Sequence, residues 1–268
     1  MSALTFGLVQ TSTLWHDPAG NRARFESILD GSPDGVDVVV LPEMFATGFT
    51  MDSQTQAEPA DGGSLLWLKQ QAVARKQVLC GSLSIRDGER CVNRFVWAEP
   101  DGAVTCYDKR HRFRMAGEHE HYAAGVERVV ISYRGLRILP FVCYDLRFPV
   151  WLRNSATLDG DYDMLLGVAN WPAARQLAWQ TLLRARAIEN LAACVAVNII
   201  GRDGNDVAYA GGSAAFGPDG EQWLDAGEAD GVFLVEVDTA MVRGFRQRFP
   251  AWQDSDSFDV LSTPDRRT

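Results

Sequence analysis

The stretch at residues 138–154, ILPFVCYDLRFPVWLRN, constrains the fold more than any other part of the chain. Its first five residues form a continuous apolar run, which predicts a strand buried on both faces. Residues 148–152 have proline at their second position, which is typical of the first turn of a helix because that turn needs no N–H there. The sequence therefore predicts a strand, a sharp turn and a helix, with Cys143 at the turn.

Cys143 has two interpretations. A thiol at such a turn stands near helix N–H groups, whose partial positive charge favours thiolate over thiol, so it is a candidate nucleophile. The alternative is a small apolar cysteine buried in the core, which is common in proteins. Other residues of the chain have to decide between catalysis and packing.

The order of the predicted elements indicates the fold class. Strands at 5–11 and 36–41 alternate with helices at 21–30 and 64–75. The later predicted elements are strands at 77–86, 90–98, 103–108, 129–133 and 137–142, a strand at 164–168, a helix at about 173–190, strands at 193–200, 214–216, 222–224 and 232–237, a helix from Thr239 and a polar tail. Strands that alternate with helices at the start and after Cys143, but run consecutively in between and at the end, predict an α/β fold of two facing sheets covered by helices.

Composition excludes several classes of function. A net charge of −9 argues against a nucleic-acid binder, which needs a basic stripe. The first residues show no basic leader and no apolar run approaches membrane-spanning length, so we expect a cytoplasmic protein without a membrane partner. Five widely spaced cysteines without a CxxC pair argue against a disulfide framework. No phosphate-binding glycine motif occurs, and we expect no cofactor.

Two charged residues follow predicted strands and are candidate partners of the thiol. Glu43, in LPEMFATGF, leaves the apolar layer at the carboxyl end of its strand, where α/β sites usually lie, and could accept a thiol proton. Its alternative is an exposed loop glutamate. Lys109 closes the strand TCYDK, and its ammonium could stabilise an oxyanion, whereas the cations that follow it are expected to be a solvated face.

The segment EHEH at residues 118–121 raises the question of a metal site. His119 and His121 would share a face on a strand, and imidazole is a common metal ligand. The spacing suggests no third ligand and HExxH is absent, so we predict no metal. A glutamate that hydrogen-bonds and orients Lys109 is the preferred role for this segment.

Three blocks, LPEMFATGF, YDKRHRF and VCYDLRFP, occur in this order and resemble the signature blocks of the nitrilase superfamily of carbon-nitrogen hydrolases. The resemblance spans almost the whole chain, and three dispersed blocks in order are far more specific than one. It implies that the general base of the family falls on Glu43, its lysine on Lys109 and its nucleophile on Cys143. The second glutamate of the family falls on Glu118, which precedes a glycine at the usual distance, with Glu120 as the alternative.

The resemblance also implies a four-layer αββα sandwich, formed by a single domain at 1–268, and the pairing of two such sandwiches in a homodimer. The oxyanion hole would combine the Lys109 ammonium with the backbone N–H of Tyr144. The homodimer is also expected from an apolar face on the helix after the turn, formed by Phe148, Val150, Trp151 and Leu152.

Within the superfamily, DKRHRFRMAGEH, CYDLRFPVW and NWPAARQLAWQTLLRARAIEN resemble the omega-amidase branch. This resemblance implies hydrolysis of the side-chain amide of a small 2-oxo dicarboxylic acid monoamide, 2-oxoglutaramate or 2-oxosuccinamate, through a thioester. The lysine block departs from the KIHLFD of many relatives but keeps Lys109. The alternatives are another activity of the superfamily, such as aliphatic amidase, N-carbamoyl hydrolase or nitrilase, and a thiol-bearing binding protein without turnover.

An acidic protein that binds a carboxylate needs a cation in its pocket. Arg175 follows NWP at the carboxyl end of a predicted strand and could pair bidentately with such a carboxylate. Its alternative is an exposed residue in the first turn of a helix. Arg112 and Arg114 are rivals for the carboxylate, and Phe45 and Trp171 are further candidates for substrate contact.

Overall fold

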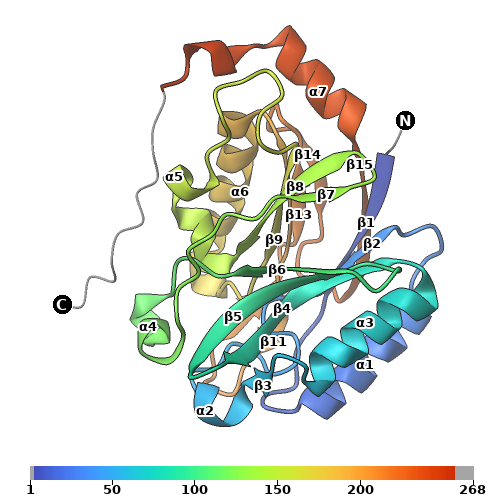
Figure 1. Cartoon of the computed structure of the whole chain (residues 1–268), viewed down its shortest axis with the longest axis vertical. Coiled ribbons are helices and arrows are strands. Elements are labelled where there is room, and N and C mark those ends of the chain that lie inside the picture. The colour runs from blue at the N-terminus through green and yellow to red at the C-terminus, as the bar shows by residue number, and fades with distance from the viewer. Residues whose placement is uncertain (1–2, 257–268) are drawn as a thin grey trace.

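Two mixed β-sheets lie face to face, with helices on the outer face of each, in the computed structural model of residues 3–256 (Figure 1). The first sheet has the order β15-β1-β2-β4-β5-β6, and β3 also pairs with β4. Its strands are β1 (Ala3–Gln10), β2 (Val38–Val40), β3 (Glu58–Pro59), β4 (Val78–Asp87), β5 (Arg90–Ala98), β6 (Val104–Asp108) and β15 (Gly231–Asp238). β1, β2 and β4 are parallel, whereas β5, β6 and β15 join by antiparallel pairing.

The second sheet has the order β14-β13-β10-β9-β8-β7. Its strands are β7 (Ile131–Tyr133), β8 (Leu136–Val142), β9 (Met164–Val168), β10 (Ala193–Val197), β13 (Ala214–Phe216) and β14 (Gln222–Asp225). β8, β9 and β10 are parallel at the centre. β11 (Ile200–Arg202) and β12 (Ala208–Ala210) form a separate hairpin.

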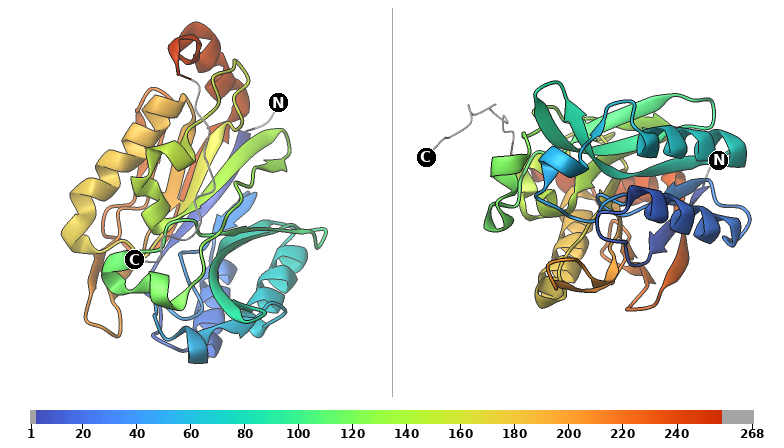
Figure 2. Two further views of the ribbon diagram at one scale, coloured as in Figure 1. Left: turned by 60° about the vertical axis from the view of Figure 1, so that its left-hand side comes forward. Right: turned by 90° about the horizontal axis from the view of Figure 1, so that it is seen from below.

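The helices complete a four-layer αββα sandwich. α1 (Pro18–Asp30) and α3 (Gly63–Arg75) pack side by side on the first sheet, and α6 (Gln176–Asn190) packs on the second (Figures 1 and 2). The shorter helices are α2 (Ser53–Gln56), α4 (Glu118–His121), α5 (Pro149–Leu152) and α7 (Thr239–Arg248), with 3-10 turns at η1 (Arg114–Ala116), η2 (Cys143–Arg147), η3 (Ala173–Arg175) and η4 (Ala251–Asp254). Within residues 3–256, no helix combines the length and apolar character that a bilayer crossing requires.

Alternating side chains explain how the sheets form two cores. On β1, Leu4, Phe6 and Leu8 belong to the buried cluster shared by both sheets, while Val9 belongs to the cluster under α1 and α3. On β2, Val39 likewise faces the helices. Because successive strand residues point to opposite faces, a continuous apolar run fits a strand that is covered on both sides.

The predicted elements are confirmed, with differences at their ends. The sharp turn predicted at Cys143 is the 3-10 turn η2, and the helix predicted at 148–152 is α5. The predicted helix at 173–190 is a 3-10 turn followed by α6, and the predicted strand at 193–200 divides into β10 and the start of β11. The short elements α2, β3, α4 and β12 were not predicted because they lack a measurable period. The polar tail from residue 257 lies outside the described residues.

A buried carboxylate fastens α7 to the second sheet. Asp163 precedes β9, is fully buried, and accepts hydrogen bonds from the guanidinium groups of Arg137, Arg243 and Arg246 at 2.8–3.2 Å. Burial alone would raise the pKa of Asp163, but the hydrogen bonds from Arg243 and Arg137 lower it to about 2. The cluster therefore links helix and sheet through charge.

Asp163→Asn should destabilise the fold by about 3 kcal/mol, since removing one partner of a buried ion pair leaves the other charges uncompensated. The pKa of this carboxyl is depressed by folding, so its contribution is present above pH 4 and should be lost as the pH falls from about 4 towards 2. Urea unfolding of wild type and variant across this range measures both effects. Asp206→Asn, which removes an exposed pair with Arg202, is the matched control and should change stability by less than about 0.5 kcal/mol. Equal stability of Asp163→Asn and wild type at pH 7 would contradict the assignment.

Candidate active site

The carboxyl ends of strands from both sheets meet at one edge of the sandwich and deliver polar side chains there. Glu43 follows β2, Lys109 follows β6, Cys143 follows β8 and Asn170 follows β9. β2 is parallel to β4, and β8 to β9, so their carboxyl ends point the same way within each sheet. This placement is where ligands of α/β sheets usually bind.

A buried ammonium joins two buried carboxylates. Lys109 Nζ lies 2.9 Å from Glu43 Oε1, and 2.9 and 3.0 Å from the two carboxylate oxygens of Glu118. The three side chains are at most 1% exposed. Glu118 is the first residue of the short helix α4, and its carboxylate also accepts a hydrogen bond from the backbone N–H of Phe113.

Glu43 is held by two asparagines as well as by the lysine. Asn93 Nδ2 donates to Glu43 Oε1 at 2.8 Å, and the backbone N–H of Asn170 donates to Glu43 Oε2 at 2.8 Å. Asn170 Nδ2 also donates to the Glu43 carbonyl at 2.8 Å. The Glu43 carboxylate is therefore fixed in position beside Cys143.

Cys143 occupies a strained turn. Its φ is 45°, in the left-handed region that a residue with a side chain adopts at a cost. The turn places Sγ 3.9 Å from the carbonyl oxygen of Asn170 and on the wall of a cavity. Tyr144 is the second residue of η2, whose first N–H groups have no partner inside the turn.

The pKa of the Cys143 thiol is set by burial and by two charged neighbours. The helix N–H groups were expected to favour the thiolate, with Glu43 as the base that takes the thiol proton. In the structure, burial and then the Glu43 carboxylate raise the pKa of the Cys143 thiol well above its usual range, and Lys109 only partly opposes them. The thiol therefore needs a base at the moment of attack, and Glu43, the base that the sequence predicted, lies beside it.

The charges of the other two groups are also set by their neighbours. Burial alone would lower the pKa of Lys109, but the Glu118 and Glu43 carboxylates raise it above its usual range, so Lys109 stays an ammonium. Burial raises the pKa of Glu118, and the nearby Glu43 charge adds to this, while Lys109 opposes both. Lys109 and Glu118 therefore each shift the pKa of the other.

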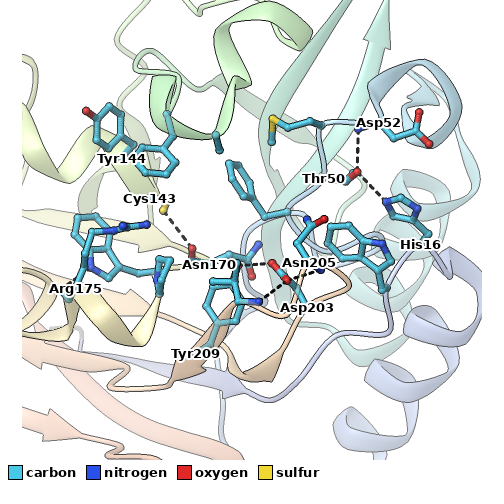
Figure 3. Close-up of a pocket in the computed structure, with 18 of the residues that line it drawn as sticks. His16, Thr50, Asp52, Cys143, Tyr144, Asn170, Arg175, Asp203, Asn205 and Tyr209 are labelled. Carbon is cyan, nitrogen blue, oxygen red and sulfur yellow. Dashed lines mark hydrogen bonds between the residues drawn. The ribbon is translucent and has the colours of Figure 1, made fainter.

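The cavity beside Cys143 has a volume of about 540 Å³. Figure 3 shows Cys143, Tyr144 and Arg175 at one end of it, and His16, Thr50 and Asp52 at the other. The hairpin β11–β12 supplies further lining residues, among them Asp203, whose carboxylate accepts from Tyr209 Oη at 2.8 Å.

Two guanidinium groups line the cavity next to aromatic rings. Arg147 lies 4.8 Å from the Trp171 ring centroid, and Arg175 lies 5.0 Å from that of Phe113. Among residues 3–256, no carboxylate pairs with either guanidinium. Both cations are therefore available to an anion that enters the cavity.

The predicted site residues separate into those that the structure brings together and those that it does not. Glu43, Lys109, Glu118 and Cys143 converge, and Tyr144, Arg175 and Trp171 line the same cavity. The alternative Glu120 has an exposed side chain beside His119 and does not contact Lys109.

The prediction that Phe45 contacts the substrate is not supported by its position. It is fully buried under α1 and α3, where its ring lies 5.7 Å from that of Phe25 and 5.9 Å from that of Trp67, and it does not line the cavity. Its place in the Glu43 block made it a candidate, but its side chain points to the opposite face of the sheet.

The structure also shows where the rival arginines and the two histidines of the metal alternative lie. Arg112 donates to the Tyr122 carbonyl, and Arg114 lies exposed in η1, so neither lines the cavity. His119 and His121 stand on the helix α4 and not on a strand. Within the described part of the chain, no three His, Cys, Asp or Glu side chains gather as metal ligands.

Sequence reasoning missed three residues of the site: Asn93, Asn170 and Arg147. Asn93 is an inward polar residue on β5, a strand that is otherwise mostly apolar, and this break in the pattern was a usable signal. Asn170 and Arg147 stand inside the quoted blocks NWP and VCYDLRFP, but their spacing did not show which way they point.

Comparison with known proteins agrees with this geometry. The family model for carbon-nitrogen hydrolases matches residues 5–247. The chain is 46% identical to the omega-amidase YafV of Escherichia coli K12 over 96% of this chain and 99% of that protein, and 30% identical to a 2-oxoglutaramate amidase of Bacillus subtilis over 93% and 96%.

Solved structures agree as well. A CN-hydrolase superfamily protein of Xanthomonas campestris, solved with an arsenic adduct in its active site, has a TM-score of 0.94 and 45% identity over 97% of this chain and 100% of that chain. An amidase of Nesterenkonia sp., in which acrylamide has added to the active-site cysteine, has a TM-score of 0.79 and 25% identity over 92% and 98%. The chain belongs to the carbon-nitrogen hydrolase family.

Proposed function

We propose that the protein is a cysteine-dependent omega-amidase, which hydrolyses the side-chain amide of a small 2-oxo dicarboxylic acid monoamide such as 2-oxoglutaramate or 2-oxosuccinamate. The proposal is supported by the relatives named omega-amidase and 2-oxoglutaramate amidase. The observation that carries it is the thiol of Cys143, placed between a buried Glu43–Lys109–Glu118 trio and a cavity with two unpaired guanidinium groups.

The first half of the reaction is acyl transfer to the thiol. Glu43 accepts the Cys143 proton as sulfur attacks the amide carbonyl, since the raised pKa keeps the thiol protonated until then. The developing oxyanion is stabilised by the Lys109 ammonium and the Tyr144 N–H. Glu43 then passes its proton to the leaving nitrogen, and ammonia departs from a thioester.

The second half uses the same groups. Water enters where ammonia left, Glu43 removes its proton, and the hydroxyl attacks the thioester carbonyl. The oxyanion forms again in the same place, and its collapse returns the thiol. Glu118 stays hydrogen-bonded to Lys109 and fixes the ammonium throughout both halves.

The carboxylate of the substrate selects it from other amides. An acidic protein repels an anion at long range, so binding requires local cations. Arg147 and Arg175 provide two, each beside an aromatic ring that orients it. This proposal adds Arg147 to Arg175, and it distinguishes a 2-oxo acid monoamide from a nitrile or a simple aliphatic amide, which would leave the guanidinium groups unpaired.

The assembly and location are also proposals. The expected apolar face of α5 is smaller than predicted, because Trp151 and Leu152 are buried within the protomer and only Val150 is strongly exposed. On α6, Leu177 is 82% exposed and Ile188 is 46% exposed. These three side chains, on two helices of one outer layer, are the surface that we assign to a homodimer of single-domain subunits. Five free thiols fit a reducing cytoplasm.

The function is tested by comparing kcat/KM for 2-oxoglutaramate, its methyl ester, glutamine and a simple aliphatic nitrile, with ammonia release as the readout. The free acid should be preferred over the ester by about 100-fold, because burying an unpaired guanidinium is costly, and Arg147→Met should reduce this preference.

Three variants serve as controls for the chemistry. Cys143→Ala, Glu43→Gln and Lys109→Met should each lower kcat by at least about 1000-fold, and the losses should not add because the groups act as a unit. A chelator should leave the rate unchanged. Equal efficiency for acid and ester, or preferential hydrolysis of the nitrile, would refute the substrate class, and turnover by Cys143→Ala would refute the thiol mechanism.

The pH profile of Cys143 alkylation by iodoacetamide should report the balance of its neighbours. Alkylation requires the thiolate, so the rate should rise at a pH well above the pH at which the rate of a free cysteine rises. Glu43→Gln removes a charge that raises the pKa and should move the profile to lower pH, whereas Lys109→Met should move it to higher pH. Peptide mass mapping separates Cys143 from the partly exposed Cys106. Identical profiles in all three proteins would contradict this electrostatic balance.

The dimer predicts a mass near twice the 29.6 kDa of the chain by light scattering at micromolar concentration. Leu177→Glu combined with Ile188→Glu should shift the protein towards monomer, since both charges would be buried at the interface. Val73→Glu, on the helix α3 of the opposite outer layer and 50% exposed, is the control and should leave the mass unchanged. A wild-type mass of one chain would end the proposal.

A further inference from the structure

The two donors of the proposed oxyanion hole come from different sheets. Lys109 directly follows β6 of the first sheet, whereas Tyr144 lies two residues beyond the end of β8 in the second. Hydrogen-bond donors stabilise an oxyanion only where both reach the same small volume, and a misplacement of 1 Å is enough to cost rate. The site therefore needs a rigid connection between the two strand ends.

The Asp145 carboxylate provides this connection. It is fully buried, and each of its oxygens accepts two hydrogen bonds. Oδ1 accepts from the backbone N–H and from Nδ1 of His111, both at 2.8 Å. Oδ2 accepts from Tyr107 Oη at 2.8 Å and from the backbone N–H of Val142 at 3.1 Å. Three donors thus come from the Lys109 side of the site, two from His111 and one from Tyr107 on β6, and the fourth, from Val142, comes from the Cys143 side.

The four donors flank the two reacting groups closely along the chain. His111 and Tyr107 stand two residues after and two residues before Lys109, and Val142 directly precedes Cys143. Asp145 directly follows Tyr144, so its carboxylate restrains the backbone on both sides of the Cys143–Tyr144 peptide. That peptide carries the N–H of the oxyanion hole, and Cys143 has a φ of 45° that the surrounding contacts have to maintain.

The donors are themselves held in place. The His111 ring stacks on Phe148 with 3.7 Å between centroids and 7° between planes. Tyr107 Oη accepts from Trp151 Nε1 at 3.0 Å and from the backbone N–H of Arg110 at 3.2 Å, which directs its proton to Asp145. A carboxylate only accepts, so His111 Nδ1 carries the proton in this pair.

We propose that Asp145, with His111 and Tyr107, is a positioning device that sets the distance between the Lys109 ammonium and the Tyr144 N–H across the two sheets. None of the three touches the substrate cavity, and none is a catalytic residue. The proposal rests on the proposed function only in taking Lys109 and Tyr144 as the donors to an oxyanion on the substrate of Cys143.

The decisive comparison is between a reaction that forms an oxyanion and one that does not. Alkylation of Cys143 by iodoacetamide is a displacement at carbon that forms a C–S bond and releases iodide, without an oxyanion. Asp145→Asn replaces one oxygen by an NH₂ group that faces two donors in either orientation. It should lower kcat for the preferred amide by about 30-fold with KM within about threefold, whereas the alkylation rate should stay within about twofold.

Two variants of His111 separate the hydrogen bond from the shape of the ring. His111→Asn can place an N–H donor near the position of Nδ1, whereas His111→Ala cannot. The asparagine variant should recover most of the kcat that the alanine variant loses. Asp108→Asn is the matched control, because this carboxylate adjoins Lys109 in sequence but pairs with Arg94 in a separate surface groove, and both rates should stay within about twofold of wild type.

Propanal gives a readout that needs no turnover. The Cys143 sulfur adds to the aldehyde carbon, the carbonyl electron pair moves to oxygen in the oxyanion hole, and the thiol proton passes to Glu43. Protection of Cys143 from iodoacetamide measures the affinity for propanal, which should fall by about tenfold in Asp145→Asn.

The possible results are distinct. If wild type releases no ammonia from any of the amides, the proposed function fails, and the propanal affinity still tests the role of Asp145. Unchanged kcat and unchanged propanal affinity in Asp145→Asn would overturn the inference. Loss of kcat, propanal affinity and alkylation rate together would also overturn it, because that pattern means general disruption of the turn.

Discussion

The ammonium of Lys109 between Glu43 and Glu118 is the interaction on which the site depends. Moving these charges out of water costs several kcal/mol for each ion, and only close pairing offsets that cost. The trio forms because elements distant in sequence converge on one sheet edge, and its hydrogen bonds to Asn93 and Asn170 complete the pairing. Burying these charges costs free energy of folding, and it fixes a carboxylate and an ammonium in position beside the Cys143 thiol.

The large elements could be predicted from the sequence because each follows a clear period. Apolar runs gave the buried strands, and the order of strands and helices gave two sheets with helices outside. The short elements α4 and β12 could not be predicted, since three or four residues do not show a period. The turn at Cys143 and the helix after it were placed correctly, but Pro149 is a helix signal only for α5 and does not show that the turn itself is a 3-10 helix.

The residues of the candidate site could also be predicted, but the electrostatic effects of their neighbours could not. Glu43, Lys109 and Cys143 lie shortly after strand ends. The ordered blocks of sequence distinguish them from the other charged residues and cysteines of the chain. The protonation state of Cys143 depends on how deeply the thiol is buried and on the distance to Glu43, and neither quantity follows from local sequence. Phe45 shows the same limit, because a strand end fixes where a residue lies but not which face it occupies.

The raised pKa of the Cys143 thiol also bears on oxidative damage. Peroxides attack the thiolate, and susceptibility follows thiolate character and access to solvent. Cys143 lies in a turn that leaves it 9% exposed, and burial and the Glu43 carboxylate both raise the pKa of its thiol; in the proposed mechanism it becomes a thiolate as Glu43 accepts its proton during attack on a bound carbonyl. Under the proposed mechanism, the burial that makes the nucleophile depend on its substrate therefore also lowers its reactivity towards oxidants between turnovers.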